Sequence, residues 1–318
     1  MNNFFKNYLI IISFILVLLV FHRKFNGSSE SDSSYVNDGL NRIDFSDMLT
    51  TKDVYDSIKC RQSIKIIVQT TICVHDLTDD QHVSGAIWNH GIWEGPIMQK
   101  YMDLISNNPD WLIFDIGAQV GQYSLFSAQL GRNVIAVEPF FDNVLRINKA
   151  VRTEGFGHRI TLIRNAVSNK KNEIKRLFPY KGDLGGQTLL NHKKEIYTRE
   201  DMQKDKYLVE TILFDDLIEF LPNQPNGSPY KKGILKIDIE GFEPYAFESA
   251  HKMFNLIDFQ VIFMEWVHLP RHADLADLVE KMIDLFTKHK LVAYDGGNKL
   301  DRNNWRQWPQ DVVWLKEQ

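Results

Sequence analysis

The chain has 318 residues, with 37 Lys and Arg against 41 Asp and Glu, which gives a formal net charge of −4. Hydrophobic residues make up 44% and charged residues 25%, which is ordinary for a globular protein and excludes a disordered or fibrous chain. Because the charge is nearly balanced, we expect no nucleic-acid partner bound through its phosphates.

The first apolar segment is Tyr8–Phe21, an uncharged run of fourteen residues. It is shorter than the roughly 20 residues that span a typical bilayer, and it lies within the range of a signal-peptide core. A signal-anchor over residues 1–25, a cleaved signal that ends near Gly27, and a buried helix all remain open. The basic residues that follow the run favour the anchor, with residues 26–44 as a stem and the remaining chain in the secretory pathway.

The chain contains only two cysteines, Cys60 and Cys73. This number excludes a zinc site built from cysteines and a disulfide scaffold. An oxidising lumen would permit a single bridge, but two buried free thiols are the favoured interpretation. The surrounding segment Ile64–Val74 is β-branched and predicts a strand.

From residue 95 onward, strands and helices alternate, which predicts a parallel sheet covered on both faces. A polar, glycine-containing stretch at Lys181–Lys206 interrupts this order and predicts a long exposed loop. One doubly wound domain from about residue 45 to residue 318 accounts for the pattern. The predicted strands are Trp111–Ile116, Val134–Val137, Ile160–Ile163, Ile234–Ile239, Gln260–Met264, Leu291–Tyr294 and Val312–Leu315, and the predicted helices include Ile97–Ile105, Leu125–Leu130, Leu145–Val151 and Leu275–Phe286.

Polar residues and glycines follow the strand ends, where open parallel sheets bind ligands. Gly117 permits a sharp turn and Gly121 permits the next helix to pack close to the sheet, in a Gly-x-x-x-Gly pattern that differs from a pyrophosphate-binding loop. Glu138 ends the next strand, where a carboxylate can accept hydrogen bonds from ribose hydroxyls. Asn165 follows the third strand and is placed to meet an adenine edge. Together they predict a nucleoside pocket without a diphosphate.

Four motifs in this order carry a resemblance to a known family. They are Asp115-Ile-Gly-Ala-Gln-Val-Gly-Gln-Tyr-Ser124, Val137-Glu-Pro139, Asn165-Ala-Val-Ser168 and Lys236-Ile-Asp-Ile-Glu-Gly-Phe-Glu243. The chain resembles the FkbM family of S-adenosylmethionine-dependent methyltransferases from about Gly91 to Leu315, and Gly91-Ile-Trp-Glu94 resembles the family's preceding segment. Gln119 is a departure, since the family usually has Asn there.

The resemblance implies a class I methyltransferase fold, a Rossmann-like, doubly wound, seven-stranded and mostly parallel sheet with an antiparallel last strand. It also implies S-adenosylmethionine as cofactor and methyl transfer to oxygen. It places Asp115, Gly117 and Gly121 at the methionine end, Glu138 at the ribose, and Asn165 near the adenine. The full predicted cofactor set is Glu94, Asp115, Gly117, Ala118, Gly121, Tyr123, Ser124, Glu138, Pro139, Asn165, Ala166 and Asp238.

A sugar hydroxyl is a poor nucleophile, so a general base should assist the transfer. The candidate catalytic residues at the ends of the fourth and fifth strands are Asp238, Glu240, Glu265 and His268. Asp238 is the first choice, because in this fold it ends the strand nearest the cofactor's sulfur, and His268 is second because its usual pKa suits a base. His268 without a role, as a loop histidine, is the alternative.

Metal binding was weighed for Glu265, His268 and His272, but Pro270 interrupts the helix that their spacing needs, so we predict no metal site. For Trp93, Trp266 and Trp305, core packing is favoured over stacking on a sugar.

These observations predict an O-methyltransferase that modifies a glycan sugar hydroxyl, anchored by a single pass in the Golgi membrane with a lumenal catalytic domain. The alternatives are a protein secreted after signal cleavage, a lipid or small-metabolite acceptor, and an inactive module that binds glycan or a partner protein. Acidic residues at both Glu138 and Asp238 argue against the inactive module. A nicotinamide-dependent reductase is disfavoured because the chain lacks Gly-x-Gly-x-x-Gly. The sequence does not indicate an oligomeric state.

Overall fold

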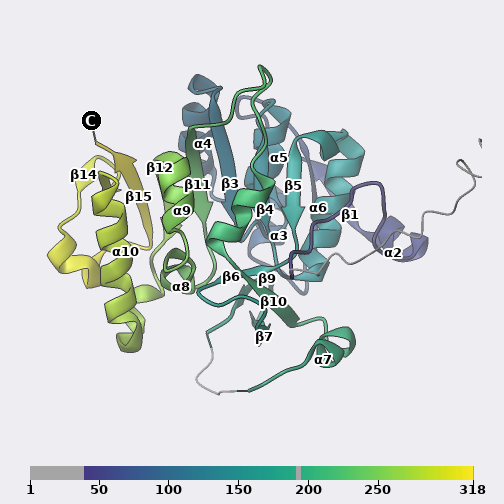
Figure 1. The fold of residues 1–318 in the computed structure, drawn as a ribbon. Coiled ribbons are helices and arrows are strands. Elements are labelled where there is room, and N and C mark those ends of the chain that lie inside the picture. Colours follow the sequence, from purple (N-terminus) through teal and green to yellow (C-terminus); the bar gives the residue numbers. More distant parts are fainter. Residues whose placement is uncertain (1–38, 191–194, 318) are drawn as a thin grey trace, which may run out of the picture. The chain divides into compact units, whose positions relative to one another are not determined.

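The computed structural model describes residues 39–190 and 195–317 (Figure 1). They belong to one compact unit that begins at Gly39. Residues 39–44, which were expected in the stem, pack on this unit, since the Ile43 backbone N–H donates to the Leu162 carbonyl at 2.8 Å. The predicted anchor over residues 1–25 lies outside the described residues. Within the ranges given above, no helix combines the length and apolar character needed to cross a membrane.

The core of the domain is a sheet of eight strands, in which five neighbouring strands run parallel (Figure 1). Strand β15 runs antiparallel to both of its neighbours, which confirms the predicted mostly parallel sheet with an antiparallel last strand. The eighth strand, β14, is a two-residue addition that forms a hairpin with β13. In sheet order the strands are β14 (Asn298–Lys299), β13 (Leu291–Asp295), β15 (Asp311–Lys316), β12 (Asp258–Glu265), β11 (Lys232–Ile237), β3 (Trp111–Ile116), β4 (Val134–Val137) and β5 (Ile160–Ile163).

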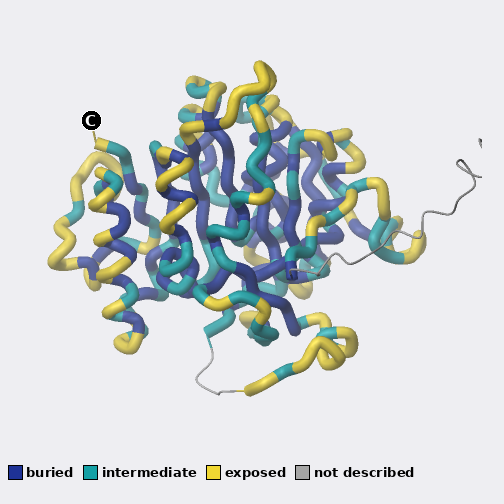
Figure 2. Tube along the Cα trace, viewed as in Figure 1, coloured by how far each residue is buried: buried dark blue, intermediate teal, exposed yellow. Residues whose placement is uncertain are grey.

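Helices cover both faces of this sheet, so its central strands are buried on both sides (Figure 2). Successive side chains of β3 alternate between two cores: Leu112 and Phe114 face one, Trp111 and Ile113 the other, as the period of a strand requires. The helices that contribute to the first core are η2 (Phe214–Phe220), α8 (Glu243–Phe247), α9 (His251–Leu256) and α10 (Ala276–Lys288); those of the second are α3 (Val83–His90), α4 (Gly95–Asn107), α5 (Gln122–Gln129), α6 (Phe141–Glu154) and η1 (Phe156–His158).

Helix α6 ends at a glycine, since Gly155 adopts a φ of +76° and its N–H donates to the Val151 carbonyl.

The remaining short elements lie between the helices and strands given above. They are α2 (Lys52–Ser57), η3 (Leu269–Arg271), η4 (Ala273–Leu275) and η5 (Arg302–Gln307).

The two cysteines form a disulfide, so the prediction of free thiols was wrong. Strands β1 (Lys59–Gln62) and β2 (Thr71–Val74) pair antiparallel, and their register places Cys60 directly opposite Cys73. Directly opposed residues of an antiparallel pair have neighbouring Cβ atoms, which allows a bridge. The predicted single strand Ile64–Val74 begins too early, since only Thr71–Val74 is a strand and its partner is Lys59–Gln62.

The stretch Lys181–Lys206 was predicted as a long exposed loop, but it contains regular secondary structure. It contains β9 (Asp183–Thr188), which pairs with β8 (Phe178–Tyr180), and helix α7 (Arg199–Lys204). Backbone hydrogen bonds to the segment before α3 hold the hairpin, because the Leu184 N–H donates to the Asp79 carbonyl at 3.1 Å. A separate three-stranded sheet stands next to it, formed by β6 (Ala166–Ser168), β10 (Leu208–Leu213) and β7 (Ile174–Arg176).

Candidate active site

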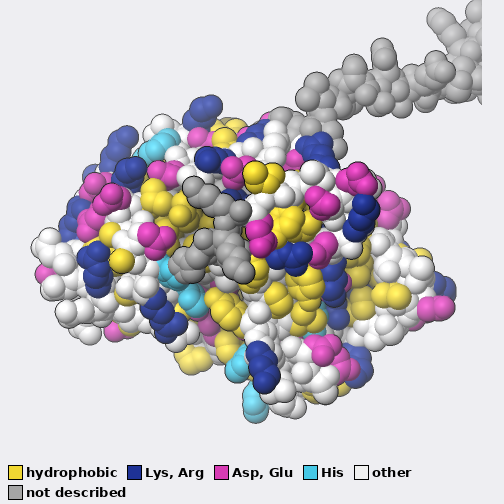
Figure 3. Space-filling view, turned by 90° about the horizontal axis from the view of Figure 1, so that it is seen from below, with side chains coloured by type: hydrophobic (Ala, Val, Ile, Leu, Met, Phe, Trp, Pro, Cys, Tyr) yellow, Lys and Arg dark blue, Asp and Glu magenta, His cyan; other side chains and the backbone are white. Residues whose placement is uncertain are grey.

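The ends of β3, β4, β11 and β12 and the β8–β9 hairpin line one cavity of about 390 Å³. Figure 3 shows this end of the molecule, where hydrophobic side chains gather beside charged ones and histidines. Of the predicted site residues, Gly121 and Ser124 do not line the cavity. The others do: Glu94, Asp115, Gly117, Ala118, Tyr123, Glu138, Pro139, Asn165, Ala166, Asp238, Glu240, Glu265 and His268.

Asp115 connects the end of β3 to the start of α5. Its Oδ2 accepts hydrogen bonds from the Ser124 backbone N–H at 3.0 Å and from the Ser124 hydroxyl at 2.5 Å. Burial raises the pKa of Asp115 to about 6, although the Ser124 hydrogen bonds act in the opposite direction. Ser124 therefore supports Asp115 from within the helix, which corrects its predicted direct contact with a cofactor.

Gly117 and Gly121 both adopt the left-handed backbone conformation, with φ values of +82° and +84°. A Cβ at Gly117 would lie 1.9 Å from the carbonyl oxygen of Asp238, so only glycine allows the end of β3 to approach the end of β11 this closely. A Cβ at Gly121 would lie 2.9 Å from Ile147 of α6. Gly121 thus permits close packing against α6, whereas the prediction had named the sheet as the surface approached.

Glu138 is 4% exposed and accepts three hydrogen bonds. The donors are the Phe140 N–H and the Asn143 Nδ2 to Oε1, at 2.8 and 3.1 Å, and the Gln119 N–H to Oε2 at 2.7 Å. Burial raises its pKa to about 8, against the effect of these donors. A carboxylate offers about four lone-pair positions, so one position on Oε2 remains for a ligand hydroxyl.

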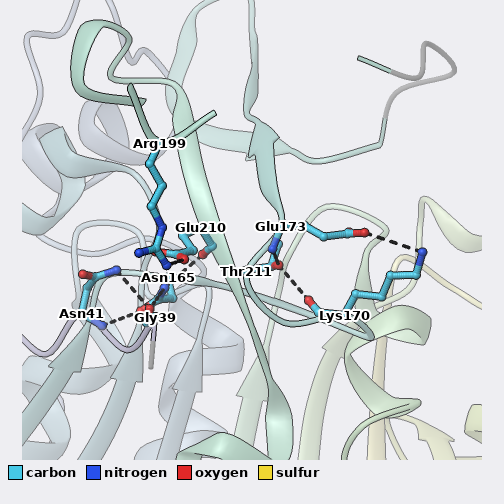
Figure 4. A network of polar contacts seen from close by, with 8 residues as sticks. All are labelled: Gly39, Asn41, Asn165, Lys170, Glu173, Arg199, Glu210 and Thr211. Atoms are coloured by element: carbon cyan, nitrogen blue, oxygen red, sulfur yellow. Dashed lines mark hydrogen bonds and ion pairs between the residues drawn. The ribbon is translucent and has the colours of Figure 1, made fainter. Parts of the chain in front are cut away.

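Asn165 is fully buried, and its side-chain amide binds the protein itself (Figure 4). Nδ2 donates to the carbonyls of Gly39 at 2.8 Å and Glu210 at 3.1 Å, and Oδ1 accepts from the Asn41 N–H at 2.8 Å. Both amide hydrogens are thus used within the fold. Asn165 thus joins residues 39–41 to β10, and it also lines the cavity, where its place near an adenine stays a prediction.

A buried lysine, Lys236, lies among carboxylates on the methionine side of the predicted pocket. Its Nζ lies 2.8 Å from Asp238 Oδ2 and 5.5 Å from the centre of the Tyr123 ring. Burial opposes its charge, but Asp238, Tyr123 and Glu94 outweigh burial and raise its pKa well above the usual value. The Tyr123 hydroxyl donates to Glu94 Oε2 at 3.2 Å. These two residues of the predicted cofactor set therefore lie beside Lys236.

Glu240, Glu265 and His268 form a second polar cluster in the cavity wall. His268 Nε2 lies 2.9 Å from Glu240 Oε2 and 3.4 Å from Glu265 Oε2. Burial raises the pKa of both carboxyls, and the neighbouring Asp238 acts in the same direction. The contact with Glu240 raises the pKa of His268. All four predicted catalytic residues therefore share one wall, with Asp238 paired to lysine and the other three grouped around the imidazole.

Comparison with known proteins places this site in a family. The profile described as "Methyltransferase FkbM domain" matches residues 115–290, which is more than half of the chain. The chain belongs to the FkbM methyltransferase family. The match begins at Asp115 and includes every predicted catalytic residue, and it confirms the resemblance given by the motifs. The FkbM domain has the class I methyltransferase fold, as predicted.

Solved methyltransferases are similar to this chain at low sequence identity and low TM-score. An FkbM methyltransferase from Methylobacillus flagellatus is 17% identical, with a TM-score of 0.40 over 65% of this chain and 44% of that one. An O-methyltransferase from Bacillus cereus, solved with SAH, is 12% identical, with a TM-score of 0.36 over 68% and 79% of the two chains. A putative caffeoyl-CoA O-methyltransferase from Staphylococcus aureus is 10% identical, with a TM-score of 0.38 over 70% and 83%. No curated protein matches the chain significantly.

The FkbM domain also presents site residues that the sequence analysis did not assign. Tyr180, from the β8–β9 hairpin, lines the cavity with its ring 40% exposed and parallel to His268, at 6.2 Å between ring centres and 15° between planes. Gln119 has a φ of +50°, and its Nε2 would lie 2.7 Å from a Cβ at Gly185 of β9. Gln119, which stands where the family usually has Asn, thus places a longer side chain against the β8–β9 hairpin. Lys236 had a sequence signal, since a lysine within a buried strand requires a partner.

The three tryptophans divide in the FkbM domain. Trp266 and Trp305 are buried at 0% and 2% exposure, and Trp266 Nε1 donates to the Trp305 carbonyl at 2.9 Å, which confirms core packing. Trp93 is half-buried and packs against the second core, as predicted, but it also lines the cavity. Gln122 holds it there, because its side-chain amide accepts from the Trp93 N–H and donates to the Trp93 carbonyl.

Proposed function

We propose that this protein is an S-adenosylmethionine-dependent O-methyltransferase that acts on a hydroxyl of a sugar. Its membership of a methyltransferase family supports the reaction class. The cavity lies at the carboxyl ends of parallel strands, and its volume of about 390 Å³ falls in the usual range for ligand sites. The observation that carries the proposal is that carboxylates suited to a cofactor, a paired Asp and an exposed aromatic ring share this one cavity.

The residues present fit the cofactor. Glu138 retains a lone pair for a ribose hydroxyl, and Gly117 keeps the turn after β3 free of a side chain. Glu94 is a carboxylate that lines the same cavity, beside Tyr123 and Lys236, where it would hold an ammonium group. When bound, S-adenosylmethionine supplies a methyl group already activated by its sulfonium, so the protein mainly has to position an acceptor oxygen.

Asp238 is the proposed general base. With the cofactor bound, an acceptor oxygen would take its activated methyl group, and the Asp238 carboxylate would accept the proton that this hydroxyl loses. Lys236 fixes the orientation of that carboxylate through its 2.8 Å contact with Oδ2. General base catalysis of this kind contributes about 10² to 10⁴-fold.

Tyr180 supports a sugar as the acceptor. Its ring lies open on the cavity wall above the catalytic cluster, and sugar rings present C–H faces that pack on aromatic rings. Trp93 provides a second aromatic surface in the same cavity. A small aliphatic acceptor would not need either ring.

The proposed acceptor is a glycan, and the proposed location is the lumen of the Golgi in the secretory pathway. The Cys60–Cys73 disulfide supports it, because disulfides persist in oxidising compartments and are rare in the cytosol. The predicted anchor over residues 1–25 agrees with this location. Attachment to the membrane by this anchor is therefore part of the proposal.

The test is methyl transfer by the purified full chain. It is incubated with methyl-labelled S-adenosylmethionine and a panel of glycosides, and mass spectrometry detects a gain of one methyl group on a sugar. We expect Asp238→Asn to abolish transfer and Tyr180→Ala to raise KM for the sugar about tenfold, with Tyr180→Phe close to wild type. Cofactor binding without any labelled sugar would refute the proposal that the acceptor is a sugar. Absence of cofactor binding would refute the proposed methyl transfer.

A further inference from the structure

Glu240, Glu265 and His268 bring three metal-ligating atoms together in the cavity wall. One oxygen of each carboxylate and one imidazole nitrogen all lie within 4.8 Å of one another. His268 Nε2 lies 2.9 Å from the Glu240 oxygen and 3.4 Å from the Glu265 oxygen. Adjacent ligands at about 2.1 Å from an octahedral cation lie about 3.0 Å apart. The two distances from His268 Nε2 are therefore close to those between neighbouring ligands of a single small cation.

His268 contacts both carboxylates, but its contact with Glu265 is the longer one, at 3.4 Å. The Oε2 atom of Glu265 is shielded from solvent and makes no hydrogen bond, while its side chain as a whole is only 15% exposed. A buried carboxylate oxygen that makes no hydrogen bond is unfavourable, so a cation closer than the imidazole would stabilise it. This oxygen lies on the side of the carboxyl that faces His268 Nε2.

The charges around this group are also unbalanced. Asp238 and Glu243 act on Glu265 in addition to Glu240, which makes four carboxyls in one region. The buried Lys236 is one nearby cation, but its Nζ lies on Asp238 at 2.8 Å. Arg271 is another, and it acts on His268. His268 is thus the imidazole between two carboxyls, and an added positive charge between the three ligand atoms would be stabilised.

We propose that Glu240, Glu265 and His268 bind one divalent cation, with the free coordination positions directed into the cavity. Two carboxylate ligands favour a hard cation such as Mn²⁺ or Mg²⁺. Three protein ligands leave positions open for water or substrate, which is the pattern of a catalytic rather than a structural site. The proposed ligands differ from the set Glu265, His268 and His272, for which the sequence predicts no metal site.

The use of the cation rests on the proposed function, whereas its binding does not. A hydroxyl bound to a divalent cation has a lowered pKa. An acceptor hydroxyl at an open position would therefore give its proton more readily to Asp238, which lines the same cavity and is not one of the three ligands.

Mn²⁺ binding to the chelator-treated full chain tests the site directly. The free Mn²⁺ signal in electron paramagnetic resonance is titrated with protein, and we expect one bound Mn²⁺ per chain. Glu265→Gln keeps the shape of the side chain and should weaken binding at least tenfold, and Glu240→Gln should do the same. Glu219→Gln, at an exposed glutamate outside the cavity lining, is the matched control and should bind as wild type.

Unfolding temperatures without Mn²⁺ establish that each variant is folded. Absence of saturable binding to the wild type, or unchanged affinity in folded Glu265→Gln, would overturn the inference. If Mn²⁺ binds once per chain but no sugar is methylated, the site stands and the proposed reaction fails. If the chelated protein methylates sugars at the full rate and binds no Mn²⁺, the reaction stands and the cation site fails.

Discussion

Replacement of Gly117 by alanine tests how closely β3 and β11 approach at the cavity. A Cβ at this position would lie 1.9 Å from the carbonyl oxygen of Asp238, and the backbone cannot move aside as a flexible side chain does. The left-handed φ of +82° adds about 1–2 kcal/mol for a non-glycine residue. Overpacking against the backbone adds about 1–3 kcal/mol. Gly117→Ala should therefore destabilise the protein by about 2–5 kcal/mol.

Gly155→Ala is the matched control, because its φ of +76° is similar but a Cβ there would meet nothing within 4 Å. It should show the backbone effect alone, about 1–2 kcal/mol. At about 2 °C per kcal/mol for a domain of this size, the unfolding temperature should fall by about 2–4 °C in Gly155→Ala and by about 4–10 °C in Gly117→Ala. Circular dichroism measures both. Equal shifts in the two variants would refute the close approach.

Three further outcomes follow from the buried groups. Reduction of the Cys60–Cys73 bridge, which closes a loop with a sequence separation of 13, should lower the free energy of unfolding by about 3 kcal/mol, measured by urea denaturation with and without reductant; an unchanged midpoint would contradict this. Burial raises the pKa of Glu138 to about 8, above about 4.3 in the unfolded chain, so its contribution to stability is full below pH 4.3 and is lost as the pH rises through 8. The unfolding temperature of the ligand-free protein should fall over this range, and a profile as steep in Glu138→Gln would argue against Glu138 as the cause. Lys236→Met should cost about 3 kcal/mol, because it leaves Asp238 without its buried partner, and a loss below about 1 kcal/mol in urea denaturation would mean that water replaces the lysine.

The strands next to the cavity could be predicted because their signals are local. The strands β3, β4 and β5 begin and end at the predicted residues, since each is a short, buried apolar run, with a polar residue at or near its end. The β8–β9 hairpin could not be predicted in this way. It contains Gly185 and Gly186, which are poor strand residues, and it depends on a hydrogen bond between Leu184 and Asp79 more than 100 residues away in the chain.

The same distinction applies to the site. The motif positions Glu138, Asp238 and Glu240 reach the cavity as expected, because the carboxyl ends of parallel strands meet at one edge. The partners of the Asn165 amide could not be predicted, since Gly39 and Glu210 are 126 and 45 residues away along the chain. Sequence alone cannot reveal that such a side chain has no donor left for a ligand.

The contacts of residues 39–43 also protect an edge of the central sheet. Strand β5 is the last strand on its side, and Arg42 pairs with Ile163 while the Arg164 N–H donates to the Asn41 carbonyl at 2.8 Å. A protein that begins at residue 45 would lose this cover and expose the polar backbone groups of β5. Exposed edge strands pair with other chains. Such a shortened form should therefore be prone to aggregation, and a soluble catalytic domain needs to begin before Gly39.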